Sequence, residues 1–163
     1  MRIEILCVGE VKKPYLKEAE KDYLSRLRHY CKIESGFIDG EKIVSNKQEK
    51  NILAKEAGKL LNRIGEGSLV AALDRKGHSC SSEELSDRIC EWQNRGLKKI
   101  VFVIGGPLGL DEKIIRRANL VLSLSEMTFA HEMVKLILLE QLYRAFTIIK
   151  GEKYHKYNQL QVS

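Results

Sequence analysis

Two loops in the second half of the chain carry the residues best suited to chemistry. Residues 105–110 (GGPLGL) follow the apolar run 100–104, and residues 125–129 (SEMTF) follow the apolar run 120–124. Short runs rich in Val, Ile, Leu and Phe are typical of buried strands in a parallel sheet. Because ligands of open α/β sheets bind beyond the carboxyl ends of the strands, the two loops are predicted to form two walls of one pocket.

The glycine-rich loop does not have the spacing of a pyrophosphate-binding loop. It lacks both G-x-G-x-x-G and the G-K-S/T of a P-loop, and Pro107 removes a backbone donor that a phosphate would use. Glycines after a buried strand still allow a ligand to approach the backbone closely, so a flat or small cofactor fits the pattern. The alternative is a tight turn that binds nothing.

The sequence carries no metal-binding pattern. His131 and Glu132 begin like the helix motif of zinc proteases, but Lys135 stands where the second histidine would be. The cysteines form no C-x-x-C pair and no zinc-like spacing. We therefore expect no metal, reduced cysteines, and a place in the core for Cys7.

Charge and aromatic content favour a nucleic-acid partner. The chain of 163 residues has a formal net charge of +6, and residues 150–157 combine cations, which suit phosphate, with rings that could stack on bases. A frayed basic terminus is the alternative. Arg144 is a further candidate, because an unpaired cation in so apolar a segment would be costly. An ion pair with Glu140, four residues earlier, is its alternative.

The elements that must position these residues alternate between strands and helices. Strands are predicted at 2–8, 33–38, 69–73, 100–104 and 120–124, and helices at 13–29, from a Ser45 cap to 63, from a Ser81 cap to 95, from about Asp111, and at 130–149. Both serines have the spacing of a capping box. This order predicts an α/β fold, a mostly parallel sheet with helices on both faces, in a single domain of residues 1–163.

The helix predicted at 130–149 is apolar on two faces. One face includes Leu138, Leu142 and Phe146, and the other includes Met133 and Leu136. A helix that is apolar on two sides must be buried on two sides. In so small a domain the second side indicates another subunit, so we predict a homodimer, with central packing inside one subunit as the alternative.

The chain has no sequence feature of a membrane or secreted protein. No apolar run reaches the roughly 20 residues that span a bilayer. Glu4 stands where a signal peptide would have its apolar region. We therefore expect a cytoplasmic protein with no membrane partner.

Five motifs, in order, closely resemble the ribosomal RNA large subunit methyltransferase H family. They are Leu73 with Asp74, I-G-G-P-x-G-L at 104–110, L-S-x-S-x-M-T-F-x-H at 122–131, E-Q-L-Y-R-A at 140–145, and Tyr154 with His155. The resemblance covers essentially the whole chain. It implies a SPOUT-class homodimer with a C-terminal trefoil knot that uses S-adenosyl-L-methionine to methylate N3 of a pseudouridine in large-subunit (23S) ribosomal RNA, acting on assembled ribosomes.

The resemblance also implies which residues bind the cofactor. By matching motif they are Leu73, Gly105, Leu124, Ser125, Glu126, Met127, Thr128 and Phe129. The acceptor N3 carries a proton, so methylation needs a base or a well-placed cation. The candidates are His155 as proton acceptor or relay, Arg144 to stabilise the developing anion or hold phosphate, and Tyr154 to stack on or orient the base.

Two other functions remain compatible with the sequence. One is a SPOUT methyltransferase that acts on another RNA site, which would bind the cofactor without modifying pseudouridine. The other is a non-catalytic module that binds RNA or the ribosome through its basic surface and has no cofactor affinity.

Overall fold

The computed structural model describes residues 1–42 and 48–154, and this part of the chain forms five strands and five helices in strict alternation. The strands are β1 (Arg2–Val8), β2 (Lys32–Ile38), β3 (Leu69–Ser79), β4 (Lys99–Ile104) and β5 (Leu120–Ser123). The helices are α1 (Pro14–Leu27), α2 (Glu49–Ile64), α3 (Ser82–Asn94), α4 (Glu112–Arg117) and α5 (His131–Ile149).

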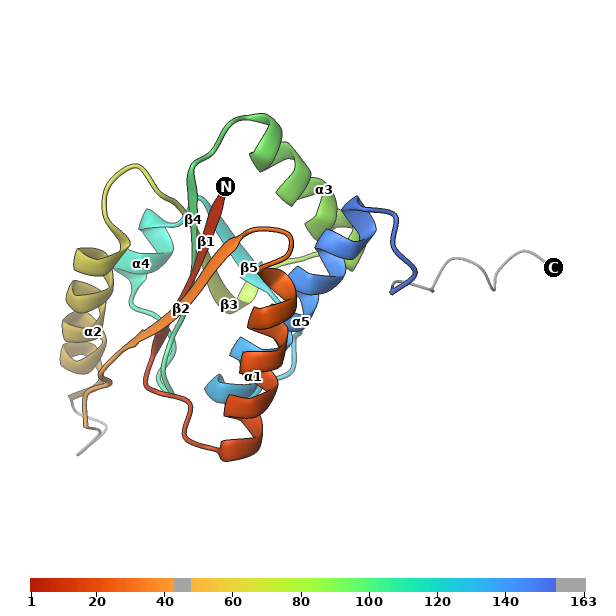
Figure 1. Ribbon diagram of the computed structural model, residues 1–163. Coiled ribbons are helices and arrows are strands. Elements are labelled where there is room, and N and C mark those ends of the chain that lie inside the picture. Colours follow the sequence, from red (N-terminus) through yellow and green to blue (C-terminus); the bar gives the residue numbers. More distant parts are fainter. Residues whose placement is uncertain (43–47, 155–163) are drawn as a thin grey trace.

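The strands form one twisted sheet in the order β2-β1-β4-β3-β5, and each of these four pairings is parallel. Helices α1, α3 and α5 cover one face of the sheet, and α2 and α4 cover the other (Figure 1). The prediction of an α/β fold with a parallel sheet between two helical layers is therefore confirmed.

Successive residues of the strands supply both halves of the core. Ile5 and Phe102 belong to the cluster that includes Phe146 of α5. Leu6 and Val101, the neighbours of those strand residues, belong to the cluster on the α2 and α4 face. Because successive side chains of a strand point to opposite faces, an uninterrupted apolar run is what a sheet covered on both sides requires.

Local capping fixes where two of the helices begin. Ser81 and Glu84 form the predicted capping box of α3: the Ser81 Oγ accepts from the Glu84 amide at 3.1 Å, and the Glu84 carboxylate accepts from the Ser81 amide at 2.7 Å. Asp111 caps α4 by accepting from the Lys113 amide at 2.8 Å. Helix α2 begins at Glu49 with Gln48 at its N-cap position, so the prediction that Ser45 caps this helix is wrong; Ser45 itself lies outside the described residues.

Strand β3 is longer than its apolar pattern, and the prediction that it ends at Leu73 is wrong. It continues to Ser79 because pairing with β5 resumes after a register shift, with Leu122 opposite both Leu73 and His78. A Cβ on Gly77 would lie 2.7 Å from the backbone of Val121, so only glycine allows the two strands to approach this closely. The extra length holds polar residues 74–77 at the carboxyl edge of the sheet.

Helix α5 lies on the sheet between α1 and α3 (Figure 1). Leu138 and Leu139 are both fully buried within the subunit, so central packing accounts for part of the helix's second apolar face. Met133 is 37% exposed and Leu136 is half-buried, so the rest of that face is open to solvent. The homodimer stays a prediction.

Candidate functional site

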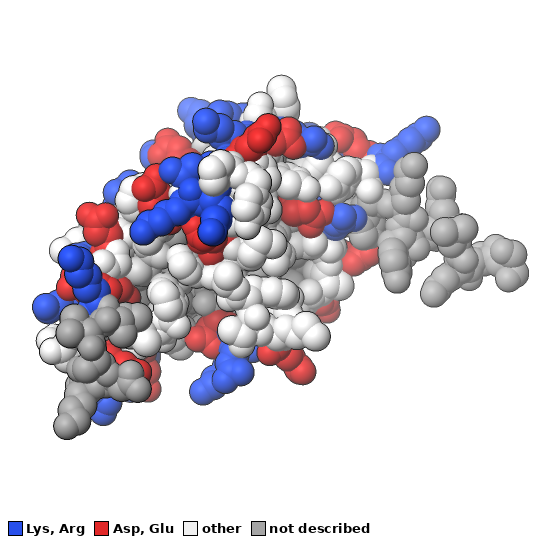
Figure 2. Space-filling view, turned by 90° about the horizontal axis from the view of Figure 1, so that it is seen from below, with Lys and Arg blue, Asp and Glu red and all other residues white. Residues whose placement is uncertain are grey.

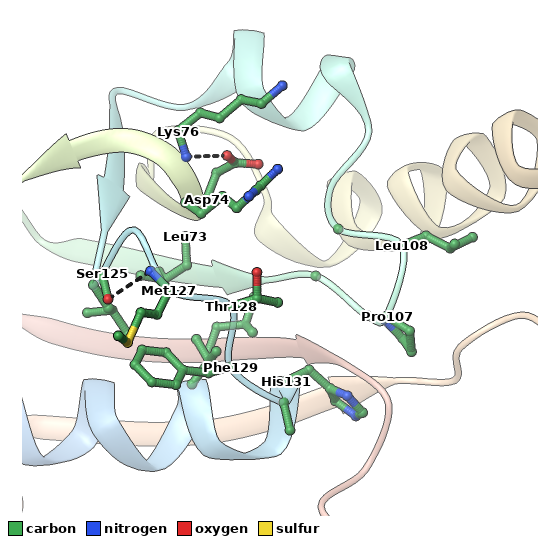
Figure 3. Close-up of a pocket in the computed structure, with 18 of the residues that line it drawn as sticks. Leu73, Asp74, Lys76, Pro107, Leu108, Ser125, Met127, Thr128, Phe129 and His131 are labelled. Atoms are coloured by element: carbon green, nitrogen blue, oxygen red, sulfur yellow. Dashed lines mark hydrogen bonds between the residues drawn. The ribbon is translucent and has the colours of Figure 1, made fainter.

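A cavity of about 540 Å³ opens at the carboxyl ends of β3, β4 and β5. It is lined by Leu73–Lys76, Ile104–Gly109, Leu122, Leu124, Ser125, Met127–His131 and Val134. Both loops that the sequence singled out contribute walls, so the prediction that they share one pocket is confirmed. Figure 3 shows Asp74 and Lys76 across the cavity from Phe129 and His131.

The first wall is built largely from backbone. A Cβ on Gly105 would lie 2.4 Å from the carbonyl oxygen of Gly109, a distance that no side chain can tolerate. The Gly109 amide donates to the Gly106 carbonyl at 2.9 Å, and Gly109 has a φ of +84°. These glycines make a tight turn that presents peptide groups, with Pro107 and Leu108 at its tip, to whatever occupies the cavity.

The second wall is held by short-range hydrogen bonds from serine. The Ser123 hydroxyl donates to the Ser125 carbonyl at 3.0 Å, and the Ser125 hydroxyl accepts from the Met127 amide at 3.0 Å. Met127 is 74% exposed and Phe129 is 38% exposed. The backbone is therefore fixed while the apolar side chains stay open at the mouth of the cavity.

The third wall, residues 74–76, was not predicted as part of the site. The Lys76 amide donates to the Asp74 carboxylate at 2.8 Å, which turns the chain and holds the Asp74 side chain in place. Arg75 and Lys76 add positive charge beside it. The sequence did contain a signal for this wall, because these polar residues follow a buried strand as the other two loops do.

The cofactor residues implied by the sequence resemblance gather at this cavity. Seven of the eight line it, and Glu126 lies in the same loop but not on the cavity wall. His131, which the sequence offered only as a rejected metal ligand, also lines the cavity at the first residue of α5. Its position directly after the second loop was the signal that could have found it.

The proposed catalytic residues lie at the other end of α5. Arg144 comes thirteen residues after His131, so the two are separated by about 20 Å along the helix axis. In Figure 1, α5 starts at the carboxyl edge of the sheet and runs away from it toward the residues near Tyr154. Within one subunit, Arg144 and Tyr154 are therefore not brought to the cavity, and His155 lies outside the described residues.

Arg144, Tyr154 and Glu140 form a compact cluster. The Arg144 Nη2 donates to Glu140 Oε1 at 2.6 Å, and its Nε donates to the same oxygen at 3.0 Å. The guanidinium carbon lies 4.9 Å from the centre of the Tyr154 ring. Burial, followed by hydrogen bonding to Tyr23, raises the pKa of Tyr154, so its hydroxyl stays protonated at neutral pH. The ion pair with Glu140, considered at the sequence level as the alternative, is present.

Metal-binding clusters and membrane-spanning helices are both absent from residues 1–42 and 48–154. No group of three or more His, Cys, Asp or Glu side chains in these ranges could hold a metal ion. No helix within them is long and apolar enough to cross a bilayer.

Comparison with known proteins gives one consistent family. A family model described as "Predicted SPOUT methyltransferase" matches residues 1–155. A protein of Desulfotalea psychrophila named ribosomal RNA large subunit methyltransferase H is 42% identical over 160 residues, covering 96% of this chain and all of the relative. A protein of the same name from Clostridium botulinum is 46% identical over 159 residues with the same coverage.

Solved structures share the fold at low sequence identity. A probable methylase family protein from Haemophilus influenzae has a TM-score of 0.56 and 13% identity, covering 94% of this chain and 70% of the other. A probable methyltransferase from Bordetella pertussis has a TM-score of 0.53 and 10% identity, covering 89% of this chain and 95% of the other. These likenesses concern the fold alone.

Proposed function

Because this chain belongs to the ribosomal RNA large subunit methyltransferase H family of SPOUT methyltransferases, we propose that it transfers a methyl group from S-adenosyl-L-methionine to N3 of a pseudouridine in large-subunit (23S) ribosomal RNA. The observation that carries the proposal is the cavity beyond β3, β4 and β5, which gathers nearly all the residues that the family resemblance assigns to the cofactor. The proposed substrate is the assembled ribosome in the cytoplasm.

The lining of the cavity fits this cofactor. The glycine turn presents peptide groups without side chains to the cavity, so a flat ring system can lie against its backbone. Leu73, Leu124 and Phe129 offer apolar contact to such a ring, while Asp74 and the cations beside it would hold the charged ends. When bound, the cofactor supplies a methyl group on a positively charged sulfur.

The acceptor nitrogen of the RNA base needs more activation by the protein than the methyl donor does. N3 of the base lies between two carbonyl groups and carries a proton, so it becomes a nucleophile only when that proton leaves. We assign proton removal or relay to His155 and stabilisation of the resulting anion to the Arg144 guanidinium, which already holds Glu140 as its counter-ion. Tyr154 presents a 37% exposed ring on which the base could stack or be oriented.

A homodimer would unite the two halves of this site. Arg144 lies about 15 Å along α5 from Val134, the cavity residue of that helix nearest to it, and Tyr154 packs against Arg144. A catalytic role therefore needs a second copy whose α5 runs in the opposite direction. The exposed side chains of Met127, Phe129 and Met133 provide apolar surface beside the cavity for such a contact. We therefore propose a composite site, with the cofactor pocket of one subunit completed by the C-terminal end of the other.

A trefoil knot is part of the same proposal. The cavity is formed where residues 73–76, 104–109 and 124–131 meet, and a SPOUT knot would cross these segments at the cofactor site. Pulling on the chain from residues 1 and 154 in a single-molecule force experiment tests it. A knotted chain releases a shorter contour length than its residue count requires, whereas release of the full length would show an unknotted chain.

The test of function is transfer of labelled methyl from S-adenosyl-L-methionine to ribosomes that lack the modification, with the product nucleoside identified by mass spectrometry. Label on N3 of pseudouridine is the expected result. Label on another nucleoside would favour a SPOUT enzyme for a different RNA site. Ribosome binding with no cofactor affinity, measured by calorimetry, would favour a non-catalytic module.

A further inference from the structure

A second cavity, of about 750 Å³, lies beside the cofactor cavity at the carboxyl ends of β1 and β2. It is lined by Gly9, Glu10, Lys12–Pro14, Phe37, Asp39–Glu41, His131 and Glu132. His131 lines both cavities, and a Cβ on Gly9 would lie 3.6 Å from its Nε2. A ligand in the second cavity would therefore be a direct neighbour of a ligand in the first.

Two of the four acidic groups that line this second cavity, Glu10 and Glu41, are paired with lysines. Glu10 forms an ion pair with Lys17 at 2.8 Å, and this hydrogen bond lowers the Glu10 pKa. Glu41 pairs with Lys59 at 2.7 Å. The carboxylate of Glu132 accepts a hydrogen bond from the Lys12 backbone amide. Asp39 and Glu132 keep their negative charge at the cavity, while Glu10 and Glu41 are balanced by their lysines.

The two lysines of the second cavity, in contrast, are not paired with acids of the described chain. Among the described residues, neither Lys12 nor Lys13 has a carboxylate within ion-pair distance. Both are exposed. Two ammonium groups without an internal counter-ion are therefore available to an anion from outside.

An exposed aromatic ring accompanies these cations. Phe37, near the end of β2, is 40% exposed and belongs to neither core cluster. The exposed part of this ring, at the edge of a cavity that also holds two lysines, gives a flat apolar surface on which a planar ligand could stack. Figure 2, which views the molecule from the carboxyl ends of the strands, shows a broad uncharged area with both basic and acidic side chains around it.

We propose that this second cavity binds a nucleotide of the RNA substrate next to the target, with its base stacked on Phe37 and its phosphate held by Lys12 and Lys13. Stacking on an aromatic ring together with cations for the backbone is how proteins hold unpaired nucleotides. The shared wall at His131 fixes that nucleotide beside the cofactor cavity. This inference rests on the proposed function, because it takes RNA as the substrate.

Kinetic measurements on unmodified ribosomes test the site. Phe37→Ala is expected to raise KM for ribosomes about tenfold, as the loss of one stacking contact would, with kcat and the calorimetric cofactor Kd unchanged. Lys12→Ala with Lys13→Ala is expected to raise KM and to reduce the dependence of log KM on log salt concentration. Lys98→Ala is the matched control, since this exposed lysine precedes β4 at the opposite edge of the sheet.

Three readouts separate this inference from the proposed function. Wild-type methyl transfer with unchanged KM in the variants would overturn the nucleotide site and leave the function standing. Ribosome binding by the wild type without transfer, weakened by Phe37→Ala in co-sedimentation, would support the site and reject the reaction. A Phe37→Ala protein whose dimer dissociates more readily in sedimentation would identify the tail of a second copy as the occupant and overturn the proposal.

Discussion

Lys135 of α5 and Glu20 of α1 form an ion pair almost entirely removed from water. The Nζ and Oε1 atoms are 2.6 Å apart, and the two side chains are 7% and 15% exposed. The Ser35 hydroxyl of β2 donates to the same carboxylate at 2.8 Å. Because Lys135 lies one turn after His131, this pair ties the start of α5, and the wall of both cavities, to α1 and the sheet.

Replacing only one member of this pair should destabilise the protein strongly. Lys135→Met leaves a buried carboxylate without its cation, and we expect the free energy of unfolding to fall by about 3 kcal/mol. The double variant with Glu20→Gln should recover most of the loss, since no buried charge remains. Urea unfolding measures both, and equal midpoints for the single and double variants would contradict this explanation. Lys17→Met, in the exposed pair with Glu10, is the control and should scarcely change the midpoint.

The glycine turn of the cofactor cavity should not tolerate a methyl group. Gly105→Ala places a Cβ against the Gly109 backbone, so we expect loss of cofactor binding in calorimetry together with a lower unfolding midpoint. Gly58→Ala is the matched control, because no atom lies within 4 Å of the added Cβ in the middle of α2. It should stabilise the protein by about 0.5–1 kcal/mol. An unchanged cofactor Kd in Gly105→Ala would contradict the proposal that the cofactor lies against this turn.

The sheet and the cavity beyond β3, β4 and β5 could be predicted from the sequence because both depend on short-range patterns. Buried parallel strands require apolar runs, and the residues that follow such runs must meet at one edge. The extension of β3 to Ser79 could not be predicted in this way, because it depends on pairing of polar residues with β5, which lies more than forty residues later. The buried ion pair of Lys135 could not be predicted either, because its partner Glu20 lies on a different helix.

The separation of Arg144 from the cavity, in contrast, could have been deduced. The sequence already predicted one continuous helix from the second loop to residue 149, and a helix of that length places Arg144 about 20 Å from its start. What the sequence could not supply is the arrangement of a second subunit, because an apolar stripe such as that of Met133 and Leu136 does not distinguish an interface from a core.

The thiol of Cys7 should make stability fall at alkaline pH. Burial in β1 raises its pKa from 9.0 to about 12, an effect that Lys135 partly opposes. Between these values the unfolded chain loses a proton that the folded chain keeps, so rising pH favours unfolding, by about 1.4 kcal/mol per pH unit for this one group. Cys7→Ala should show a shallower decline than wild type in unfolding midpoints between pH 8.5 and 10.5. Parallel declines would show that other groups cause the effect.

Mixed dimers can decide whether Arg144 acts on its own subunit's cavity or on its partner's. Arg144→Ala alone should abolish methyl transfer and leave the cofactor Kd nearly unchanged, since the arginine is assigned to the RNA acceptor and not to the cofactor. Gly105→Ala alone should also be inactive, because the added Cβ must displace the Gly109 backbone that lines its cavity. In a mixed dimer with composite sites, the intact cavity of the Arg144→Ala subunit is completed by the intact Arg144 of the Gly105→Ala subunit.

Mixing and re-annealing the two inactive proteins should therefore restore roughly a quarter of wild-type activity, because half of the dimers are mixed and each has one complete site. Circular dichroism of each variant before mixing is the control for folding, and Lys98→Ala mixed with wild type is the control for activity lost in the re-annealing itself. If Arg144 served the cavity of its own subunit, no mixed dimer would contain a complete site, and activity would stay at the level of the separate variants. That outcome would contradict the composite site.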